Sequence, residues 1–277
     1  MLNGYPIFWL TTDSWDIACQ TQLEVDGGLA YDKHPVKCYV IGDIHGCSDE
    51  LATLLEALPL EPSDRLIFLG DYVDRGPDSK GVVSTLIEWK RKGDQEVIFL
   101  KGNHEDMFLS YLGLPGNYGE MFLFNGGRET LASYGLSPRN GAPEETRSRI
   151  PQSHLEFFKG LKTYYLMEPF LCVHAGIHPS RPLDQQLEEE LLWIRDEFIL
   201  NQHSLPYTVL FGHTPQREVL FHLPYKIGLD TALVYGNELS CLEVQEKVLF
   251  QIGRGRKKVM RRMVRDKWEQ SPCSPMP

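Results

Sequence analysis

The chain has 277 residues, which suits one large domain or two small ones and is long enough to bury a sizeable core. A net charge of -10 and a pI near 5.4 argue against general nucleic-acid binding, because such proteins usually present a basic face. No apolar run approaches the length of a membrane span, no signal peptide is legible, and the cysteines show no C-x-x-C spacing. We therefore expect a reduced cytoplasmic protein with no nucleic-acid or membrane partner.

The two ends of the chain differ from its middle in composition. Residues 1–36 hold two apolar patches and a break at His34-Pro35, a pattern that predicts an N-terminal extension of unknown role: an edge strand, a strap over the core or a regulatory segment. Residues 254–277 form a tail that is rich in Lys and Arg near its start, for which we expect a solvated terminus. We assign residues 37–253 to the main domain.

Three polar clusters each follow an apolar run of residues that predicts a buried strand. The runs cover residues 38–41, 66–69 and 97–100, and the clusters begin at Gly42, Gly70 and Gly102. The clusters lie about 30 positions apart, which is the length of one strand-helix-strand unit. Three parallel strands would therefore bring Asp, His and Asn side chains to one sheet edge, where open α/β sheets bind ligands. These residue types suit a Mn, Fe, Zn or Mg ion, and no thiolate is needed.

Helical spacing between these strands predicts a helix from Ser48 to about Pro59 and another from Ser79 to Lys92, both packed on the sheet. Residues 107–134 form an aromatic, loop-rich insertion, and two interpretations remain open for it: a wall of a substrate groove or extra core packing. Residues 139–149 are polar and contain proline, so we expect an exposed loop there.

Two histidines repeat the pattern of a polar residue after a strand. Residues 171–173 run into His174, and residues 207–211 run into Gly212-His213, so we expect both histidines to be ligands. Arg195 lies between them among apolar residues, either as a phosphate clamp or as a surface ion-pair residue. Further strands are predicted at residues 219–221, 226–229, 233–235, 239–244 and 248–252. They suggest a second, antiparallel sheet packed on the first, with helices outside.

Taken together, the motifs resemble a known family. Gly-Asp-x-His-Gly, Gly-Asp-x-Val-Asp-Arg-Gly, Gly-Asn-His-Glu, His-Ala-Gly and Gly-His-Thr occur in the order seen in the phosphoprotein phosphatases of the calcineurin-like metallophosphoesterase superfamily, in their bacterial and phage-type serine/threonine branch. The resemblance implies an α/β fold, a four-layer α/β/β/α sandwich, over the metallophosphatase domain of residues 37–253. It also implies two divalent metal ions, Mn²⁺ first, with Fe, Zn or Mg as other candidates.

The resemblance further assigns a role to each motif residue. Asp43, His45 and Asp71 would hold the first metal, and Asp71, Asn103, His174 and His213 the second. Arg75, Arg195 and Asn103 would bind the substrate phosphate, His104 would protonate the leaving group, and Asp74 would orient His104. Glu105 would help to fix Asn103 and His104.

The implied function is a metal-dependent phosphomonoesterase that uses in-line attack by a metal-bridging hydroxide. Its substrates would be phosphoserine and phosphothreonine proteins, with phosphotyrosine and small aryl phosphates as further candidates. One alternative is a symmetrical dinucleoside tetraphosphate hydrolase on the same scaffold, although that group usually shows Asp where this chain has Glu105. The other is an inactive phosphoprotein-binding module, which the complete set of ligand residues disfavours. Cys47 lacks the Cys-x5-Arg setting of a cysteine phosphatase, so we do not expect it to attack phosphorus.

Overall fold

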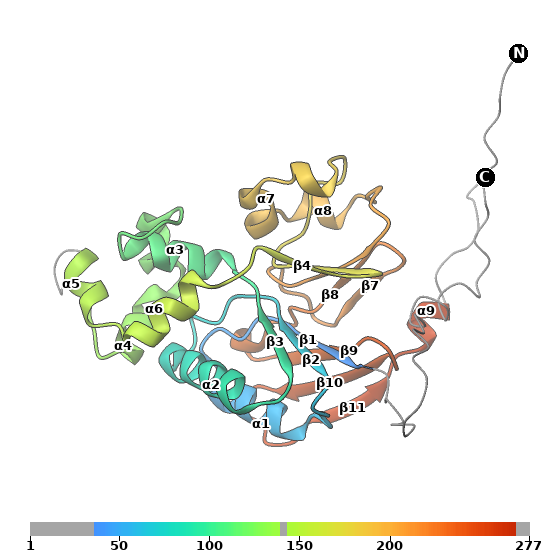
Figure 1. The fold of residues 1–277 in the computed structure, drawn as a ribbon, viewed down its shortest axis with the longest axis horizontal. Coiled ribbons are helices and arrows are strands. Elements are labelled where there is room, and N and C mark those ends of the chain that lie inside the picture. The colour runs from blue at the N-terminus through green and yellow to red at the C-terminus, as the bar shows by residue number, and fades with distance from the viewer. Residues whose placement is uncertain (1–35, 139–142, 270–277) are drawn as a thin grey trace, which may run out of the picture. The chain divides into compact units, whose positions relative to one another are not determined.

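The structure is a computed structural model that describes residues 36–138 and 143–269. The predictions for the N-terminal extension and for the end of the tail lie outside these residues. Two sheets organise the fold (Figure 1). The first has the order β11 (Met260–Met263), β10 (Val248–Gly253), β9 (Glu238–Glu243), β1 (Cys38–Ile41), β2 (Arg65–Phe68), β3 (Glu96–Phe99). The second has the order β4 (Tyr164–Met167), β5 (Phe170–Val173), β6 (Thr208–Phe211), β8 (Lys226–Gly228), β7 (Leu220–His222).

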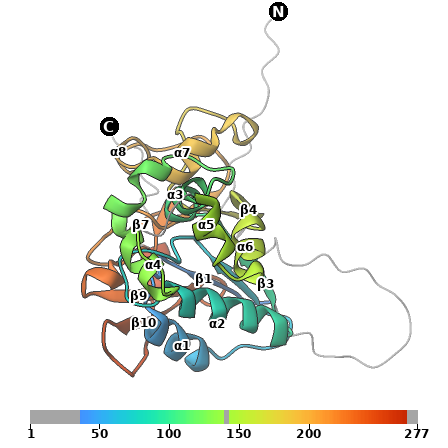
Figure 2. The same ribbon diagram turned by 90° about the vertical axis from the view of Figure 1, so that its left-hand side faces the viewer.

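Helices cover the outer face of each sheet, so the predicted four-layer α/β/β/α sandwich is confirmed. Figure 2 shows α1 and α2 on the first sheet, with α7 and α8 beside the second. The helices are α1 (Ser48–Ala57), α2 (Ser79–Lys92), α3 (Asn103–Tyr111), α4 (Arg128–Ser133), α5 (Pro143–Ser148), α6 (Gln152–Lys159), α7 (Glu188–Trp193), α8 (Asp196–Ile199) and α9 (Asp266–Glu269).

The layers follow from the alternation of side chains along each strand. In β1, Tyr39 and Ile41 belong to the core under the helices, whereas Val40 belongs to the core between the two sheets. In β5, Leu171 and Val173 face outward, into a third core shared with α7 and α8. Since both faces of these strands are buried, the strands read as unbroken apolar runs in the sequence.

The predicted antiparallel second sheet is wrong. The strands β9 and β10 extend the first sheet instead, because β9 pairs antiparallel with β1, with Val40 opposite Leu242. The true second sheet begins with β4 and β5, and β5, β6 and β8 are parallel. The predicted strand at residues 233–235 is a 3-10 turn, because left-handed Ala232 (φ 60°) and Gly236 (φ 97°) flank it.

Three other expectations are settled by the described residues. Residues 143–148 form α5, so the predicted loop is wrong in that part. Residues 260–263 form the edge strand β11, so this part of the tail is structured. In the insertion, Phe108 stacks on Phe122 at 5.1 Å and both are buried, which confirms core packing for these rings.

Four of the cysteines lie in the described residues. Cys38, Cys47, Cys172 and Cys241 are free and buried, and among residues 36–138 and 143–269 no helix is long and apolar enough to cross a membrane. Burial raises the pKa of the Cys47 thiol to about 12, which agrees with its exclusion as a nucleophile. The cytoplasmic location stays a prediction.

Candidate metal and phosphate site

The structure brings the six predicted metal ligands together at the meeting point of the two sheets. Two of them follow β1, one follows β2, one begins α3, and one follows each of β5 and β6: Asp43, His45, Asp71, Asn103, His174, His213. The expectation that the first three clusters share one sheet edge is confirmed, because β1, β2 and β3 are parallel neighbours. The last two ligands, His174 and His213, come from the second sheet. All six side chains are buried.

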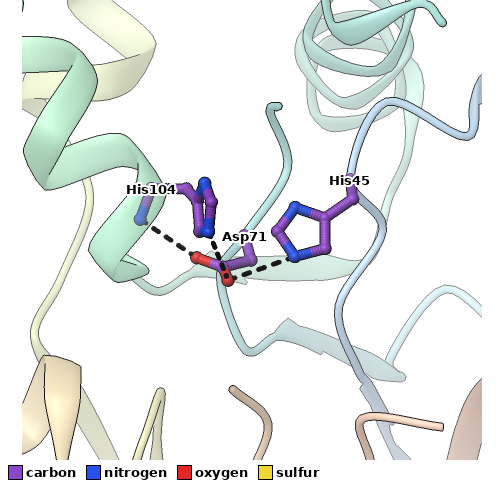
Figure 3. Close-up of side chains that lie close together, drawn as sticks. All are labelled: His45, Asp71 and His104. Carbon is purple, nitrogen blue, oxygen red and sulfur yellow. Dashed lines mark hydrogen bonds and ion pairs between the residues drawn. The ribbon is translucent and has the colours of Figure 1, made fainter. Parts of the chain in front are cut away.

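Asp71 lies at the centre of the cluster. Its carboxylate is shared by two groups of potential ligand atoms, one with His45 and His104 and one with His174 and His213. Figure 3 shows the Asp71 carboxylate between the His45 and His104 rings, with Oδ2 at 3.4 Å from His45 Nε2 and 3.9 Å from His104 Nε2. Its other oxygen, Oδ1, is 3.3 Å from His174 Nε2. One carboxylate thus faces two possible cation positions.

The protonation of the histidines leaves a cluster of lone pairs inside the site. His174 Nδ1 donates to the Leu69 carbonyl at 2.8 Å, and His45 Nδ1 donates to the Val73 carbonyl at 2.8 Å. Burial lowers the pKa of both rings, so they are neutral and their Nε2 atoms carry lone pairs. His174 Nε2 nevertheless lies 3.0 Å from Asn103 Oδ1. Acceptor atoms that converge in this way need a cation between them.

Two further observations fit a divalent cation. His213 Nδ1 is 2.9 Å from Asn103 Oδ1, and the buried His213 Nε2 has no hydrogen-bond partner among the described residues. Asp43 accepts the backbone N–H of His213 at 3.0 Å, and burial, followed by the charges of Asp230 and Asp71, raises its pKa well above the usual range. Carboxylates packed so closely are stable only if positive charge is added.

Asp230 is a buried carboxylate of the site that the sequence analysis missed. It lies two residues after the end of β8, and burial raises its pKa to about 6. Its Oδ1 accepts the backbone N–H of Ala232 at 2.9 Å. The signal was present in the sequence, because Asp230 follows a predicted strand as Asp43 and Asp71 do.

His104 and Asp74 form the predicted pair. His104 Nδ1 lies 2.6 Å from Asp74 Oδ2, so a proton is held between these two atoms. Thr130, which the sequence analysis did not single out, donates its hydroxyl to Asp74 Oδ1 at 2.6 Å. With Nδ1 fixed in this way, His104 Nε2 faces the Asp71 carboxylate and the site interior.

The two arginines differ in how firmly the structure holds them. Arg75 Nη1 lies 2.5 Å from His45 Nε2, so its guanidinium places a positive charge beside this nitrogen. Arg195 is exposed at the start of α8, and its guanidinium has no hydrogen-bond or ion-pair partner among the residues described. The pKa of His213 is lowered mainly by burial, then by the charge of His174 and then by that of Arg195, so Arg195 lies near the site.

Glu105 acts on a different target from the one expected. Its carboxylate does not bond the Asn103 or His104 side chains. It accepts backbone N–H groups from Asp71 at 2.9 Å, Tyr72 at 2.8 Å and Gly102 at 2.9 Å. Glu105 therefore fixes the loop that carries Asp71.

Replacing Glu105 with glutamine should lower the free energy of unfolding by about 1–3 kcal/mol, because an amide NH₂ cannot accept the N–H groups that it would face. Activity should fall by about 10–100-fold, since the loop carrying Asp71 loses its support. Denaturant unfolding and steady-state kinetics measure the two effects, with the exposed Glu144→Gln on α5 as the control. Wild-type stability in Glu105→Gln would show that these bonds contribute nothing.

Comparisons with known proteins point to one family. The sequence pattern of the calcineurin-like phosphoesterases matches residues 36–242. The asymmetrical bis(5'-nucleosyl)-tetraphosphatase PrpE of Anoxybacillus flavithermus is 25% identical over 237 residues, covering 75% of this chain and 90% of that protein. The protein of the same name from Bacillus cereus is 24% identical over 242 residues, covering 76% of this chain and 92% of that protein.

Solved structures show the same similarity. The structure of a proposed diadenosine tetraphosphatase has 26% sequence identity and a TM-score of 0.60, covering 79% of this chain and 94% of that chain. A cold-active protein tyrosine phosphatase has 18% sequence identity and a TM-score of 0.54, covering 82% of this chain and 78% of that chain. A serine/threonine phosphatase from Saccharomyces cerevisiae has 18% sequence identity and a TM-score of 0.52, covering 84% of this chain and 80% of that chain. The last two similarities show the fold alone.

Proposed function

The chain belongs to the calcineurin-like phosphoesterase family, and from that membership we propose that it is a metal-dependent hydrolase of dinucleoside tetraphosphates. One observation carries the choice of substrate: the curated relatives that align over 90% or more of their length are named tetraphosphatases. This reverses the order of the two enzyme hypotheses drawn from the motifs. The names of these relatives also favour asymmetrical cleavage, which yields ATP and AMP from diadenosine tetraphosphate, over the symmetrical cleavage that we expected for this alternative.

Phosphoprotein hydrolysis remains the second candidate. It is favoured by Glu105, which completes the Gly-Asn-His-Glu motif of the phosphoprotein phosphatases. The inactive-module alternative has no support, because each predicted ligand is present and lies in the cluster. A phosphoester substrate, as a small molecule or on a protein, fits the family in either case.

The residues fit a pair of divalent ions, for which we propose Mn²⁺. Asp71 would be shared, with Asp43 and His45 on one ion and three residues on the other: Asn103, His174 and His213. The facing lone pairs and the excess of buried carboxylates support this assignment. Bound ions would neutralise phosphoryl charge and acidify a water molecule for in-line attack.

The other side chains supply binding and proton transfer. Arg75 and Arg195 would bind phosphoryl oxygens and stabilise the charge that they gain in the transition state. His104 would deliver a proton from Nε2 to the leaving oxygen, while Asp74 holds Nδ1 and thereby the ring orientation. Asn103 would add a neutral oxygen, which limits the negative charge that faces an anionic substrate.

The two substrate classes can be separated directly. With Mn²⁺-loaded protein, kcat/KM for diadenosine tetraphosphate should exceed that for a phosphothreonine peptide by at least about tenfold, a difference of roughly 1.4 kcal/mol in transition-state binding. Chromatography of the products should show ATP and AMP. A better rate on the peptide would restore the protein-phosphatase function, and ADP as the main product would establish symmetrical cleavage.

A further inference from the structure

Tyr235 is an exposed aromatic residue immediately beside the site. Its side chain is 63% exposed, and the Arg75 Cζ atom lies 5.6 Å from its ring centroid. Arg75 in turn reaches His45 Nε2 with its guanidinium. The Tyr235 ring is therefore separated from the site by Arg75, one of the side chains that we assign to phosphate binding.

The loop that carries Tyr235 is fixed by several interactions. Left-handed residues at Ala232 and Gly236 reverse the chain on either side of it. The Ala232 N–H donates to the buried Asp230 carboxylate, and the Asn237 amide donates to the Thr231 carbonyl at 2.8 Å. Single exposed aromatics are common on proteins, but this one belongs to a hydrogen-bonded loop and lies next to the Arg75 guanidinium at the edge of the buried cluster of potential metal ligands.

A second exposed ring lies in another segment that contacts Arg75. The backbone N–H of Arg75 donates to the Gly126 carbonyl at 3.1 Å, and Phe124, two residues earlier, is 83% exposed. By contrast, Phe108 and Phe122 are buried, whereas Tyr111 and Tyr134 are half-buried. Tyr118, the other exposed ring of the insertion, is less exposed than Phe124. Exposed aromatics thus occur in two of the loops that contact Arg75.

We propose that Tyr235 is the stacking platform for a nucleobase of the substrate, with Arg75 bound to the adjoining phosphate. The proposal rests on the proposed function for the nucleotide class of the ligand. Bases stack on aromatic side chains because both present apolar π-faces, and a neighbouring guanidinium strengthens such a stack. Neither a phosphopeptide lacking aromatic residues nor inorganic phosphate would use this platform.

The test compares AMP with ribose 5-phosphate as competitive inhibitors of p-nitrophenyl phosphate hydrolysis. The two differ only by the base, so the ratio of their inhibition constants isolates stacking. Wild-type protein should bind AMP at least about tenfold more tightly, within the range of base–aromatic stacking. In Tyr235→Ala this ratio should fall towards one, and Tyr235→Phe should restore it. KM for diadenosine tetraphosphate should rise in Tyr235→Ala and recover in Tyr235→Phe.

The matched control is Tyr164→Ala, which removes a 40% exposed tyrosine from the edge strand β4. It should keep the wild-type ratio. An unchanged ratio in Tyr235→Ala, or equal weakening of both inhibitors, would overturn the platform and leave Tyr235 as a support for Arg75. This readout does not depend on diadenosine tetraphosphate turnover. A preference for AMP that depends on Tyr235, in a protein that does not cleave the dinucleotide, would keep the platform and reject the proposed substrate.

Discussion

Asp71→Asn should abolish nearly all activity, with a loss of at least about 10³-fold in kcat/KM. The carboxylate faces both groups of potential ligand atoms, so a neutral amide removes half of its coordinating oxygens and its whole charge from both positions at once. The loss should appear on diadenosine tetraphosphate and on p-nitrophenyl phosphate alike, because the reaction centre is common to both. Steady-state kinetics and elemental analysis of the same sample measure activity and metal content.

Two controls make this result specific. Asp49→Asn changes an exposed acid on α1 and should leave both measurements at the wild-type level. Wild-type protein treated with a chelator should lose activity and regain it on addition of Mn²⁺. If Asp71→Asn retains about two metal ions per chain and full activity, Asp71 is not shared between ions.

His104→Asn should lower kcat by an amount that depends on the leaving group. For an alkyl phosphate, whose leaving oxygen needs a proton, the loss should be about 10²–10⁴-fold, the usual contribution of general acid catalysis. For p-nitrophenyl phosphate the loss should be much smaller, because nitrophenolate leaves readily without a proton. A plot of log kcat against leaving-group pKa should therefore be steeper for the variant than for the wild type.

The companion variant is Asp74→Asn, which keeps the shape of the residue but removes the charge that faces His104 Nδ1. It should show the same dependence on the leaving group with a smaller amplitude, since His104 itself remains. Equal losses across all leaving groups in His104→Asn would exclude His104 as the acid and assign it to binding.

The sequence predicted the parts of the site that local pattern encodes. The strands β1, β2, β3, β5 and β6 are short apolar runs, and a polar residue such as Asp43 or His174 follows each of them. Their convergence was predicted correctly even though the sheet of His174 and His213 was not. Local pattern carries no record of which strand pairs with which, so the antiparallel return of β9 to β1 could not be predicted from alternation alone.

Backbone conformation explains the other misses. Residues 233–235 have the sequence pattern of a strand, but the preceding Ala232 adopts a left-handed conformation. Gly, Asn or Asp at that position would have indicated such a conformation, whereas Ala does not. Because of this error the sequence analysis did not single out Tyr235, since an aromatic residue in a strand would be expected to pack in the core and not to be exposed. His45, Asp71 and His213 also have positive φ values, so tertiary contacts rather than residue preference determine the conformation of the site.

The pairing of β1 with β9 also limits how early the fold can be completed during synthesis of the chain. Val40 pairs with Leu242, roughly 200 positions later, so one side of β1 stays without its neighbour until almost all of the described chain has left the ribosome. At about 5–20 residues per second, that interval is roughly 10–40 s. A nascent chain halted before β9 should be inactive although it carries every proposed ligand, and its open apolar edge should bind chaperones until β9 arrives.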